Sequence, residues 1–471
     1  MTFDDSFTLT IAGEAVISSS QVDVINPATG KVFATAPAAD AALLDRAVAA
    51  ARNVFPQWRD TPLEDRRQAL LMLADAIEGK AGEFGALFTR EQGRPLALAT
   101  REIIAGATWL RAVARQDVAI DVVEDSAARR VEVHHVPLGV VAAIVPWNFP
   151  FLLTIWKIAP ALLTGNTVVL KPSPYTPLCA LKLGELASTI LPGGVLNVLS
   201  GDDSLGPLMS LHPGFAKISF TGSTATGKRV MEAAAKDLKR ITLELGGNDA
   251  AIVLPDADPE AVADAMFAGA FFNSAQVCIA TKRLYVHSDI YEAVRDKLHE
   301  RLLAGVVGDG AIAGVTHGPV QNLAQYHRVN KLIDDAQAAG LTLLRGSAVP
   351  KGEGYFIPLT LVDNPPEDAA VVCEEAFGPV LPIMRFTDID DVIVRANDSE
   401  YGLAGSIWSK DIDQAVAIAK RLDTGSIWIN QNRQVAPHVP FSGFKQSGFG
   451  VENGREGMLE FTQTKSIYIP K

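Results

Sequence analysis

The stretch "AKISFTGSTATGKRVMEAAAKDLKRITLELGG", residues 216–247, decides the fold of this chain. Short apolar and β-branched runs near its two ends, at 216–221 and 241–245, predict strands. The segment between them, 226–239, has the composition of a helix. Two consecutive strands joined by a helix lie parallel in one sheet, because the helix carries the chain back to the end of the sheet at which the first strand began. The stretch therefore predicts a unit of a parallel α/β sheet.

The glycine-rich turn inside this stretch matches a phosphate-binding P-loop only in part. Gly222, Gly227 and Lys228 fill most of that template, but Arg229 stands where a Ser or Thr must hold Mg²⁺. Backbone N–H groups at the start of a helix favour an anion, since the aligned peptide dipoles leave partial positive charge there. A nucleotide triphosphate, a dinucleotide pyrophosphate and a tight turn without a ligand all fit the turn taken alone. Glu244 lies 17 residues after Gly227 (244 − 227), near the usual place of a ribose-binding acid.

The alternation of strands and helices continues on both sides of this unit. Runs typical of strands occur at 140–146, 166–172, 194–201, 250–254, 282–287, 402–409 and 425–430. Most of them are separated by stretches with helical periodicity. We therefore predict an α/β protein in which helices cover both sides of parallel sheets, with a second domain beginning near residue 249.

Composition excludes several classes of partner. The formal net charge of −12 argues against nucleic acid and anionic membranes, because both would repel such a surface. The longest uncharged run, 138–156, is interrupted by two prolines. It therefore predicts a buried strand, a loop and a helix, not a membrane span. The N-terminus lacks the charge and apolar core of a secretory signal. Three widely spaced cysteines predict neither a disulfide framework nor a metal site, and they favour a reducing compartment, the cytoplasm.

Cys278 is the cysteine with an unusual neighbourhood, "FFNSAQVCIAT" at 271–281. An isolated cysteine is ordinarily a small core residue. The Asn, Ser, Gln and Thr side chains around Cys278 would be an unusual setting for a residue that only fills a core. Cys278 is therefore a candidate nucleophile.

These stretches together resemble the aldehyde dehydrogenase superfamily. The resemblance covers nearly the whole chain, and its motifs stand in the family's order and at family-like spacing. They are "PWNFP" at 146–150, "KPSP" at 171–174, "FTGST" at 220–224, "LELGGND" at 243–249, "NSAQVCIA" at 273–280, "EEAFGPV" at 374–380 and "PFSGFKQSG" at 440–448. The resemblance implies that the glycine-rich turn is a dinucleotide turn and that the match to a P-loop is accidental.

The resemblance implies a catalytic group of five residues. Cys278 would be the nucleophile, and the amide of Asn148 with the backbone N–H of Cys278 would bind the oxyanion. Glu244 would be the general base that activates water, not a ribose ligand. Its presence disfavours an acyl-CoA-forming relative, and a catalytically silent relative is disfavoured because the thiol, amide and base positions are all filled. Lys157 and Glu452 match positions of a proton relay, although a buried ion pair explains them equally well.

The cofactor implied by the resemblance is NAD or NADP. Glu375 and Phe377 would hold the nicotinamide ribose and ring, Trp147 and Ser223 the pyrophosphate end, and Lys171 the adenosine ribose. The full set of predicted cofactor-binding residues is Val145, Pro146, Trp147, Lys171, Ser173, Gly222, Ser223, Gly246, Glu375 and Phe377. Two residues depart from the family pattern. Pro174 replaces a glutamate of many NAD-dependent relatives, so we expect an NADP 2′-phosphate to meet no negative charge there, and Ala275 replaces a frequent glycine and is expected to narrow the loop without changing the chemistry.

The substrate is expected to be a small aldehyde. By resemblance, the residues that would line its tunnel are Phe149, Trp156, Val277, Ile279 and Phe441, an apolar and aromatic wall suited to aliphatic or aromatic aldehydes. Arg433 lies near the expected mouth and could bind the carboxylate of a semialdehyde. A solvated surface arginine is the favoured alternative, because the sequence offers nothing else nearby for an anion clamp.

The resemblance also implies a division into three parts. Residues 1–118 and 138–246 would form a Rossmann-like cofactor domain, and 247–446 an α/β catalytic domain. Residues 119–137 and 447–471 would form a protruding β arm and the C-terminal tail, with the arm pairing with the tail from about 460. Such an arm predicts a homodimer or a homotetramer.

Overall fold

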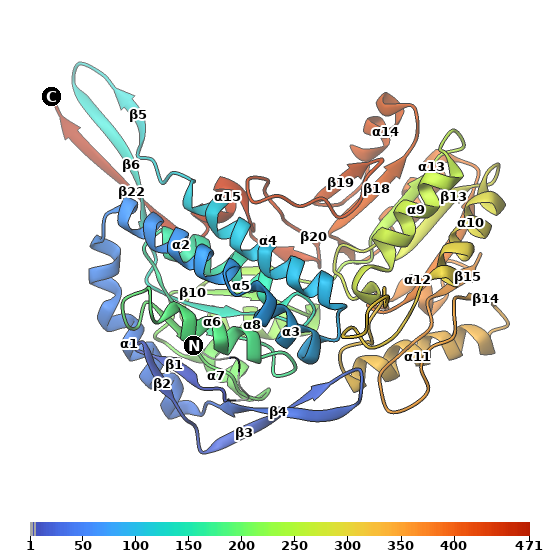
Figure 1. Ribbon diagram of the computed structural model, residues 1–471. Coiled ribbons are helices and arrows are strands. Elements are labelled where there is room, and N and C mark those ends of the chain that lie inside the picture. Colours follow the sequence, from blue (N-terminus) through green and yellow to red (C-terminus); the bar gives the residue numbers. More distant parts are fainter. Residues whose placement is uncertain (1–2, 4–5) are drawn as a thin grey trace.

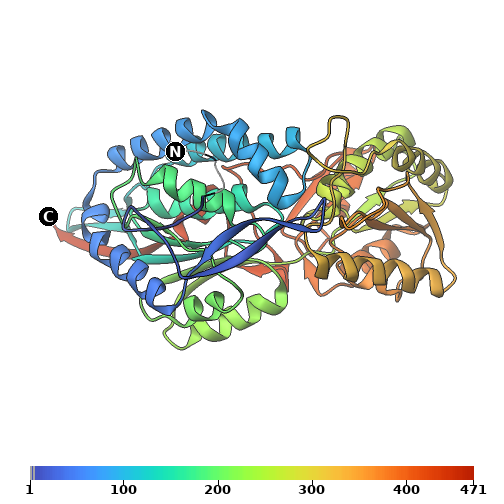
Figure 2. The ribbon, with the colours of Figure 1, turned by 60° about the horizontal axis from the view of Figure 1, so that its bottom comes forward.

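The computed structural model describes residue 3 and residues 6–471, and the predicted α/β class is confirmed. The described chain folds around two large sheets, one in each half of the molecule (Figure 1). Helices lie above and below the sheets when the molecule is turned (Figure 2). Among the described residues, none of the helices combines the length and the apolar character that crossing a membrane requires.

The first sheet has the strand order β2-β1-β9-β8-β7-β10-β11-β21. Its strands are β1 (Leu9–Ile11), β2 (Glu14–Val16), β7 (Val140–Ile144), β8 (Thr167–Lys171), β9 (Leu196–Val198), β10 (Lys217–Thr221), β11 (Arg240–Glu244) and β21 (Gly448–Phe449). The five strands β7 to β11 are parallel. The chain adds β8 and β9 on one side of β7 and then β10 and β11 on the other. A sheet of this kind binds its ligand at the carboxyl ends of the strands where the order reverses, here at β7 and β10.

The strand–helix–strand unit predicted from the sequence is present as β10, α8 (Thr224–Ala235) and β11. Thr221 pairs with Glu244, so both lie at the carboxyl ends of neighbouring strands. Ser223 is the N-cap of α8, and its hydroxyl accepts a hydrogen bond from the N–H of Thr226. The glycine-rich turn is therefore a strand-to-helix turn at the ligand-binding edge.

Helices form two layers around the first sheet. On one face α5 and α6 pack against the strands, with α2, α3 and α4 outside them, and α1, α7 and α8 cover the other face. Their bounds are α1 (Ala41–Asp60), α2 (Leu63–Glu78), α3 (Ala81–Gln92), α4 (Leu96–Ala114), α5 (Pro150–Leu163), α6 (Leu178–Ala187) and α7 (Leu205–Leu211). Thirteen of the fourteen residues of α5 are buried, which explains the uncharged run that contains it.

The second sheet has the order β14-β15-β16-β13-β12-β18-β19, and all its strands except β14 are parallel to their neighbours. Its strands are β12 (Ala250–Val253), β13 (Arg283–His287), β14 (Thr342–Arg345), β15 (Thr360–Asp363), β16 (Val380–Phe386), β18 (Ala404–Trp408) and β19 (Ser426–Ile429). Separate apolar clusters fill its two faces, one under α9 and α10 and the other under α11 to α14. These helices are α9 (Pro259–Ala270), α10 (Tyr291–Ala304), α11 (Leu323–Ala338), α12 (Ala370–Cys373), α13 (Ile389–Asn397) and α14 (Ile412–Ala419).

A three-stranded arm projects from the first half, at the upper left of Figure 1. It consists of β5 (Asp121–Asp125), β6 (Arg129–Pro137) and the C-terminal β22 (Thr462–Pro470). The predicted pairing of the arm with the tail is confirmed, with a register that runs from Thr462 opposite Pro137 to Pro470 opposite Arg129. The role of the arm in assembly stays a prediction.

The domain division stays a prediction. Within the stretch 447–471, predicted as arm and C-terminal tail, β21 pairs with β11 at the edge of the first sheet. The backbone N–H of Leu245 also donates to the carbonyl of Ser447 at 2.9 Å, and α15 (Gly454–Leu459) packs against α5. Two further small pairs complete the fold: β3 (Ser20–Asn26) with β4 (Lys31–Ala38), and β17 (Tyr401–Gly402) with β20 (Phe444–Lys445).

Candidate active site

A cavity of about 190 Å³ lies where the two halves of the molecule meet, at the carboxyl ends of β7, β10 and β11. Ten of the residues predicted for the site line it together: Pro146, Trp147, Asn148, Gly222, Ser223, Glu244, Gly246, Cys278, Glu375 and Phe377. Five further residues complete the lining: Leu153, Thr221, Leu245, Gln325 and Arg328. The structure therefore brings together residues that are as much as 231 positions apart (146 to 377).

The turn before Cys278 has an unusual backbone. Three consecutive residues without glycine's freedom, Asn273, Ser274 and Ala275, have φ angles of 53°, 52° and 61°. Such left-handed conformations cost about 1–3 kcal/mol each and persist only where surrounding structure enforces them. Here the hydroxyl of Ser274 donates to the carbonyl of Gly318 at 2.7 Å, and the amide of Gln276 donates to the carbonyl of Asn273 at 2.9 Å. Ala275 thus adopts a backbone conformation that favours glycine.

Cys278 keeps part of its surface open to the cavity, although protein atoms surround it densely. Burial raises the pKa of its thiol well above the ordinary value, and the nearby Glu244 carboxylate raises it further. Lys282 acts in the opposite direction and lowers the pKa. Of the other two cysteines, Cys179 is buried and Cys373 is exposed, and neither lines this cavity.

Glu244 lies at the end of β11 with only 4% of its surface exposed. Among the described residues neither of its carboxylate oxygens has a hydrogen-bond partner of good geometry, although the Cys278 thiol is close enough to influence its pKa. Burial raises the pKa of Glu244 to about 7, and the positive charge of Lys157 opposes part of this increase. A carboxylate with such a pKa can both take and release a proton near neutral pH.

Lys157 and Glu452 form a buried ion pair, with 2.7 Å between Nζ and Oε1. Lys157 also donates to the hydroxyl of Ser219 at 3.2 Å. The ion pair is the alternative that the sequence had left open. A proton relay through these two residues stays a prediction.

Asn148 is held by a buried network that the sequence analysis missed. Its backbone carbonyl accepts hydrogen bonds from Nη2 of Arg94 at 2.7 Å and from the amide of Asn273 at 3.2 Å, while its own amide donates to the carbonyl of Gln276 at 3.1 Å. Arg94 forms a close, fully buried ion pair with Glu102, whose carboxylate also accepts N–H groups at the start of α5. Arg94 stands 54 residues before Asn148, and no local pattern connects the two.

On the cofactor side of the cavity, the backbone at Gly246 lies so close to Glu375 that no side chain fits between them. A Cβ on Gly246 would lie 2.4 Å from Oε2 of Glu375, so a larger residue would displace this carboxylate. The other oxygen of Glu375, Oε1, accepts a hydrogen bond from the N–H of Gly247 at 3.1 Å. The rings of Trp147 and Phe377 meet edge to face at 5.4 Å between centroids. Together with the N-terminus of α8, these residues fit a dinucleotide whose phosphates lie at the helix start.

The predicted adenosine end lies along the same edge of the sheet but outside this cavity. Val145 and Ser173 are buried, and Lys171 ends β8 with 5% of its surface exposed. Burial lowers the pKa of Lys171, and the carboxylates of Asp203 and Asp202 oppose that effect. The expectation that a 2′-phosphate would meet no negative charge beside Lys171 stays a prediction, and the influence of Asp203 and Asp202 on the pKa of Lys171 argues against it. Strands β8 and β9 are neighbours, so the loop with Asp202 and Asp203 after β9 lies near Lys171 at the end of β8. These two aspartates supply negative charge there even though position 174 is a proline.

The predicted substrate wall is aromatic and continuous with the core. The rings of Trp156 and Phe441 meet at 5.8 Å, and Phe149 stacks on Phe272 at 6.2 Å. Val277 and Ile279 are 3% and 9% exposed, so little of either reaches a free surface. Sequence reasoning missed Phe272, which lies two residues after the end of α9 and carries no signal beyond its aromatic character.

Arg433 is not the solvated surface arginine that the sequence favoured. Its guanidinium lies 4.3 Å from the centroid of the Phe272 ring, and Nη2 donates to the carbonyl of Ala268 at 2.9 Å. Burial lowers the pKa of Arg433 to about 10, with a smaller effect in the same direction from Arg94. Its Nε has no hydrogen-bond partner in the part of the chain that the structure describes.

Comparison with known proteins identifies the family. The sequence matches the aldehyde dehydrogenase family over residues 16–467, and the chain belongs to that family. It is therefore an oxidoreductase that acts on aldehydes.

Two relatives and two solved structures illustrate the similarity. Aldehyde dehydrogenase LUC3 of a Fusarium species is 42% identical over 463 residues, 98% of each chain. Phenylacetaldehyde dehydrogenase of Pseudomonas fluorescens is 40% identical and covers 96% of this chain and 93% of its own. The NAD⁺ complex of an aldehyde dehydrogenase from Bacillus cereus has a TM-score of 0.96 at 34% identity, covering 99% of this chain and 96% of that one. An NADP-dependent enzyme of E. coli has a TM-score of 0.95 at 35% identity, covering 98% of both chains. The cofactor is accordingly NAD or NADP.

Proposed function

We propose that this enzyme oxidises an aliphatic or aromatic aldehyde to a carboxylic acid through a thiohemiacetal and then a thioester on Cys278. One observation carries the proposal. Cys278, Asn148 and Glu244 come from three separate parts of the chain and face one cavity, with Glu375 and Phe377 on its cofactor side.

The first step is attack of Cys278, as the thiolate, on the aldehyde carbon; the new sulfur–carbon bond moves an electron pair of the carbonyl onto its oxygen, which becomes an oxyanion. The amide of Asn148 has two hydrogens, and only one of them is used on the carbonyl of Gln276. The second hydrogen and the backbone N–H of Cys278 are available to stabilise the oxyanion. When bound, the nicotinamide ring supplies the acceptor for the hydride that leaves this carbon, and the carbon then becomes a thioester.

Release of the acid requires an activated water. Glu244 takes a proton from the water as its oxygen attacks the thioester, and the carbon–sulfur bond then breaks to return the Cys278 sulfur. The pKa of about 7 supports this role, since a base with that pKa is ionised in a useful fraction at neutral pH.

The direct test is an absorbance assay at the nicotinamide band, with NAD and NADP each offered a panel of aldehydes. We expect reduction of the cofactor with one equivalent of acid formed for each equivalent reduced. Cys278→Ser should abolish turnover, whereas Cys373→Ser, which changes a cysteine outside the cavity, should retain it. Turnover by Cys278→Ser would refute the nucleophile.

A second candidate is a semialdehyde dehydrogenase in which Arg433 binds the carboxylate of the substrate. It is favoured by the position of this guanidinium, half-buried on Phe272 with one unused donor. Arg433→Met should then lower kcat/KM about 10- to 100-fold for an aldehyde with a terminal carboxylate and leave the neutral aldehyde of equal length unaffected. Equal losses for both aldehydes would contradict this candidate.

We further propose a homodimer or homotetramer built through the arm. The outer edge of β5 has no paired strand in the described chain, and Val122 and Val123 on it are exposed. Analytical ultracentrifugation of the full chain tests this, with removal of residues 462–471 expected to yield smaller species. The reducing compartment expected from the unpaired cysteines likewise stays a prediction.

A further inference from the structure

Lys282, four residues after Cys278, is a buried cation that closes the nucleophile turn. Only 6% of its surface is exposed. Its ammonium donates to the carbonyl oxygens of Val277 at 2.9 Å, Cys278 at 2.5 Å and Ala280 at 3.4 Å. Three carbonyl groups of one turn thus converge on one nitrogen, and the orientation of the peptide that carries Cys278 depends on this side chain.

The same ammonium faces the cofactor side of the site. Nζ of Lys282 lies 3.5 Å from Oε1 of Glu375, and 14% of the Glu375 side chain is exposed. Glu375 lines the cavity beside Phe377 and is the residue that the proposed function places on the nicotinamide ribose. Lys282 is therefore a direct link between the nucleophile and the cofactor-binding carboxylate.

Three ionisable side chains act on the Cys278 thiol from the elements around it. Glu244 at the end of β11 and Asp249 before β12 raise its pKa, and Lys282 lowers it. Asp249 is buried, and it has a pKa raised by burial to about 7. Lys282 is thus the cation that favours the thiolate among the groups that act on this sulfur.

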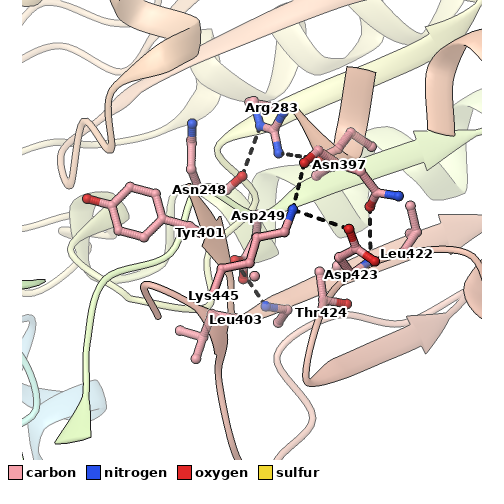
Figure 3. Close-up of a pocket in the computed structure, with 15 residues that line it drawn as sticks. Asn248, Asp249, Arg283, Asn397, Tyr401, Leu403, Leu422, Asp423, Thr424 and Lys445 are labelled. Atoms are coloured by element: carbon pink, nitrogen blue, oxygen red, sulfur yellow. Dashed lines mark hydrogen bonds and ion pairs between the residues drawn. The ribbon is translucent and has the colours of Figure 1, made fainter. Parts of the chain in front are cut away.

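Arg283, the residue after Lys282, binds backbone carbonyl groups away from Cys278. Figure 3 shows a second, smaller pocket that Asp249 and Arg283 line and to which Cys278 does not contribute. The guanidinium of Arg283 donates to the carbonyls of Asn248 at 2.9 Å and Ala396 at 2.8 Å. Lys445 in the same pocket donates to the carbonyl of Asn397 at 2.7 Å. These two cations hold loop carbonyls, so the charge available beside Cys278 is that of Lys282.

We propose that Lys282 is a positioning residue that ties the nucleophile turn to the carboxylate of Glu375, so that occupation of the ribose position and the reactivity of Cys278 are coupled. The inference rests on the proposed function for the role of Glu375. Hydroxyl groups that donate to Glu375 weaken its attraction for Lys282, because the carboxylate then shares its charge with other donors. The positive charge of the Lys282 ammonium then stabilises the thiolate of Cys278 more strongly.

The test measures the pH dependence of iodoacetamide alkylation of Cys278, with and without ADP-ribose. ADP-ribose carries the ribose that would reach Glu375 but lacks the nicotinamide ring that would shield the sulfur. Cys373→Ser serves as the parent, because Cys373 is the exposed cysteine that would react in parallel. Binding of ADP-ribose is measured separately by calorimetry for each protein.

In the parent, we expect ADP-ribose to lower the midpoint pH of the alkylation rate by about half a pH unit. Below the midpoint, the alkylation rate should then rise about threefold. Lys282→Met should raise the midpoint by about one unit or more, and ADP-ribose should no longer shift it. Lys282→Arg, which keeps the charge, should restore part of the shift. Lys182→Met is the matched control, because Lys182 is also a buried lysine in an ion pair, but its partner is Glu185 on its own helix and not Glu375.

Two outcomes would overturn the inference. One is a parent that binds ADP-ribose without any change in the alkylation midpoint, a result that needs no variant of Lys282. The other is a folded Lys282→Met protein with the midpoint and the response of the parent. A parent that does not bind ADP-ribose at all would instead refute the cofactor role of Glu375 in the proposed function.

Discussion

Glu244→Gln is expected to make the protein more stable at alkaline pH. The carboxylate is 4% exposed and lacks a hydrogen-bond partner among the described residues, and burial raises its pKa from 4.5 to about 7. The folded protein therefore holds this proton more tightly than the unfolded chain does. Below pH 4.5 Glu244 is protonated in both states and does not lower the free energy of unfolding. As the pH rises from 4.5 to 7, the free energy of unfolding falls, because the unfolded chain ionises this carboxyl group more readily than the folded protein does. At about 1.4 kcal/mol for each pH unit, the cost reaches about 3 kcal/mol above pH 7.

Urea unfolding of the cofactor-free protein measures this difference. At about pH 8 the variant should unfold with a free energy about 3 kcal/mol higher than the wild type, and the difference should shrink toward zero near pH 4.5. Glu374→Gln, at an exposed neighbour of the site, should show no such dependence. The same Glu244→Gln protein should release one equivalent of reduced cofactor and then stall, because the thioester forms without a base but is not hydrolysed. A variant that is less stable than the wild type at pH 8, or one with a normal steady-state rate, would refute the reasoning.

Three further predictions concern the oxyanion site, its buried support and the predicted adenosine end. Asn148→Ala should lower kcat about 10²- to 10³-fold while cofactor affinity stays nearly unchanged in a fluorescence titration, and unchanged turnover would remove Asn148 from the oxyanion site. Arg94→Met should lower the free energy of unfolding by about 3–5 kcal/mol, because it leaves the buried Glu102 without its cation, whereas breaking the exposed pair of Arg46 and Glu14 should change it little in the same denaturation experiment. Asp203→Asn should raise the ratio of kcat/KM for NADP to that for NAD by about tenfold, since one negative charge beside Lys171 is removed, and an unchanged ratio would mean that Asp203 does not act on the cofactor.

The sequence was sufficient for the α/β unit at the ligand-binding edge and for ten of the fifteen residues that line the cavity. Strand and helix patterns over 216–247 predicted β10, α8 and β11 correctly, because these patterns depend on neighbours within a few positions. The motifs around Asn148, Glu244, Cys278 and Glu375 predicted four residues that now line one cavity. Their chemical roles remain to be tested by the experiments above.

The sequence could not predict which charges lie beside these residues. Arg94 reaches Asn148 because α4 and α5 pack together, and Asp203 approaches Lys171 because β8 and β9 are neighbours. Burial of Arg433 depends on its contact with Phe272, which precedes it by 161 positions (433 − 272). Propensity and capping are local properties, so the sequence alone determined the α/β elements and the turn at Gly222. Burial and the proximity of charges arise only when the sheets bring distant segments together, so the raised pKa of Glu244 and the position of Lys282 between Cys278 and Glu375 were decided by the tertiary structure.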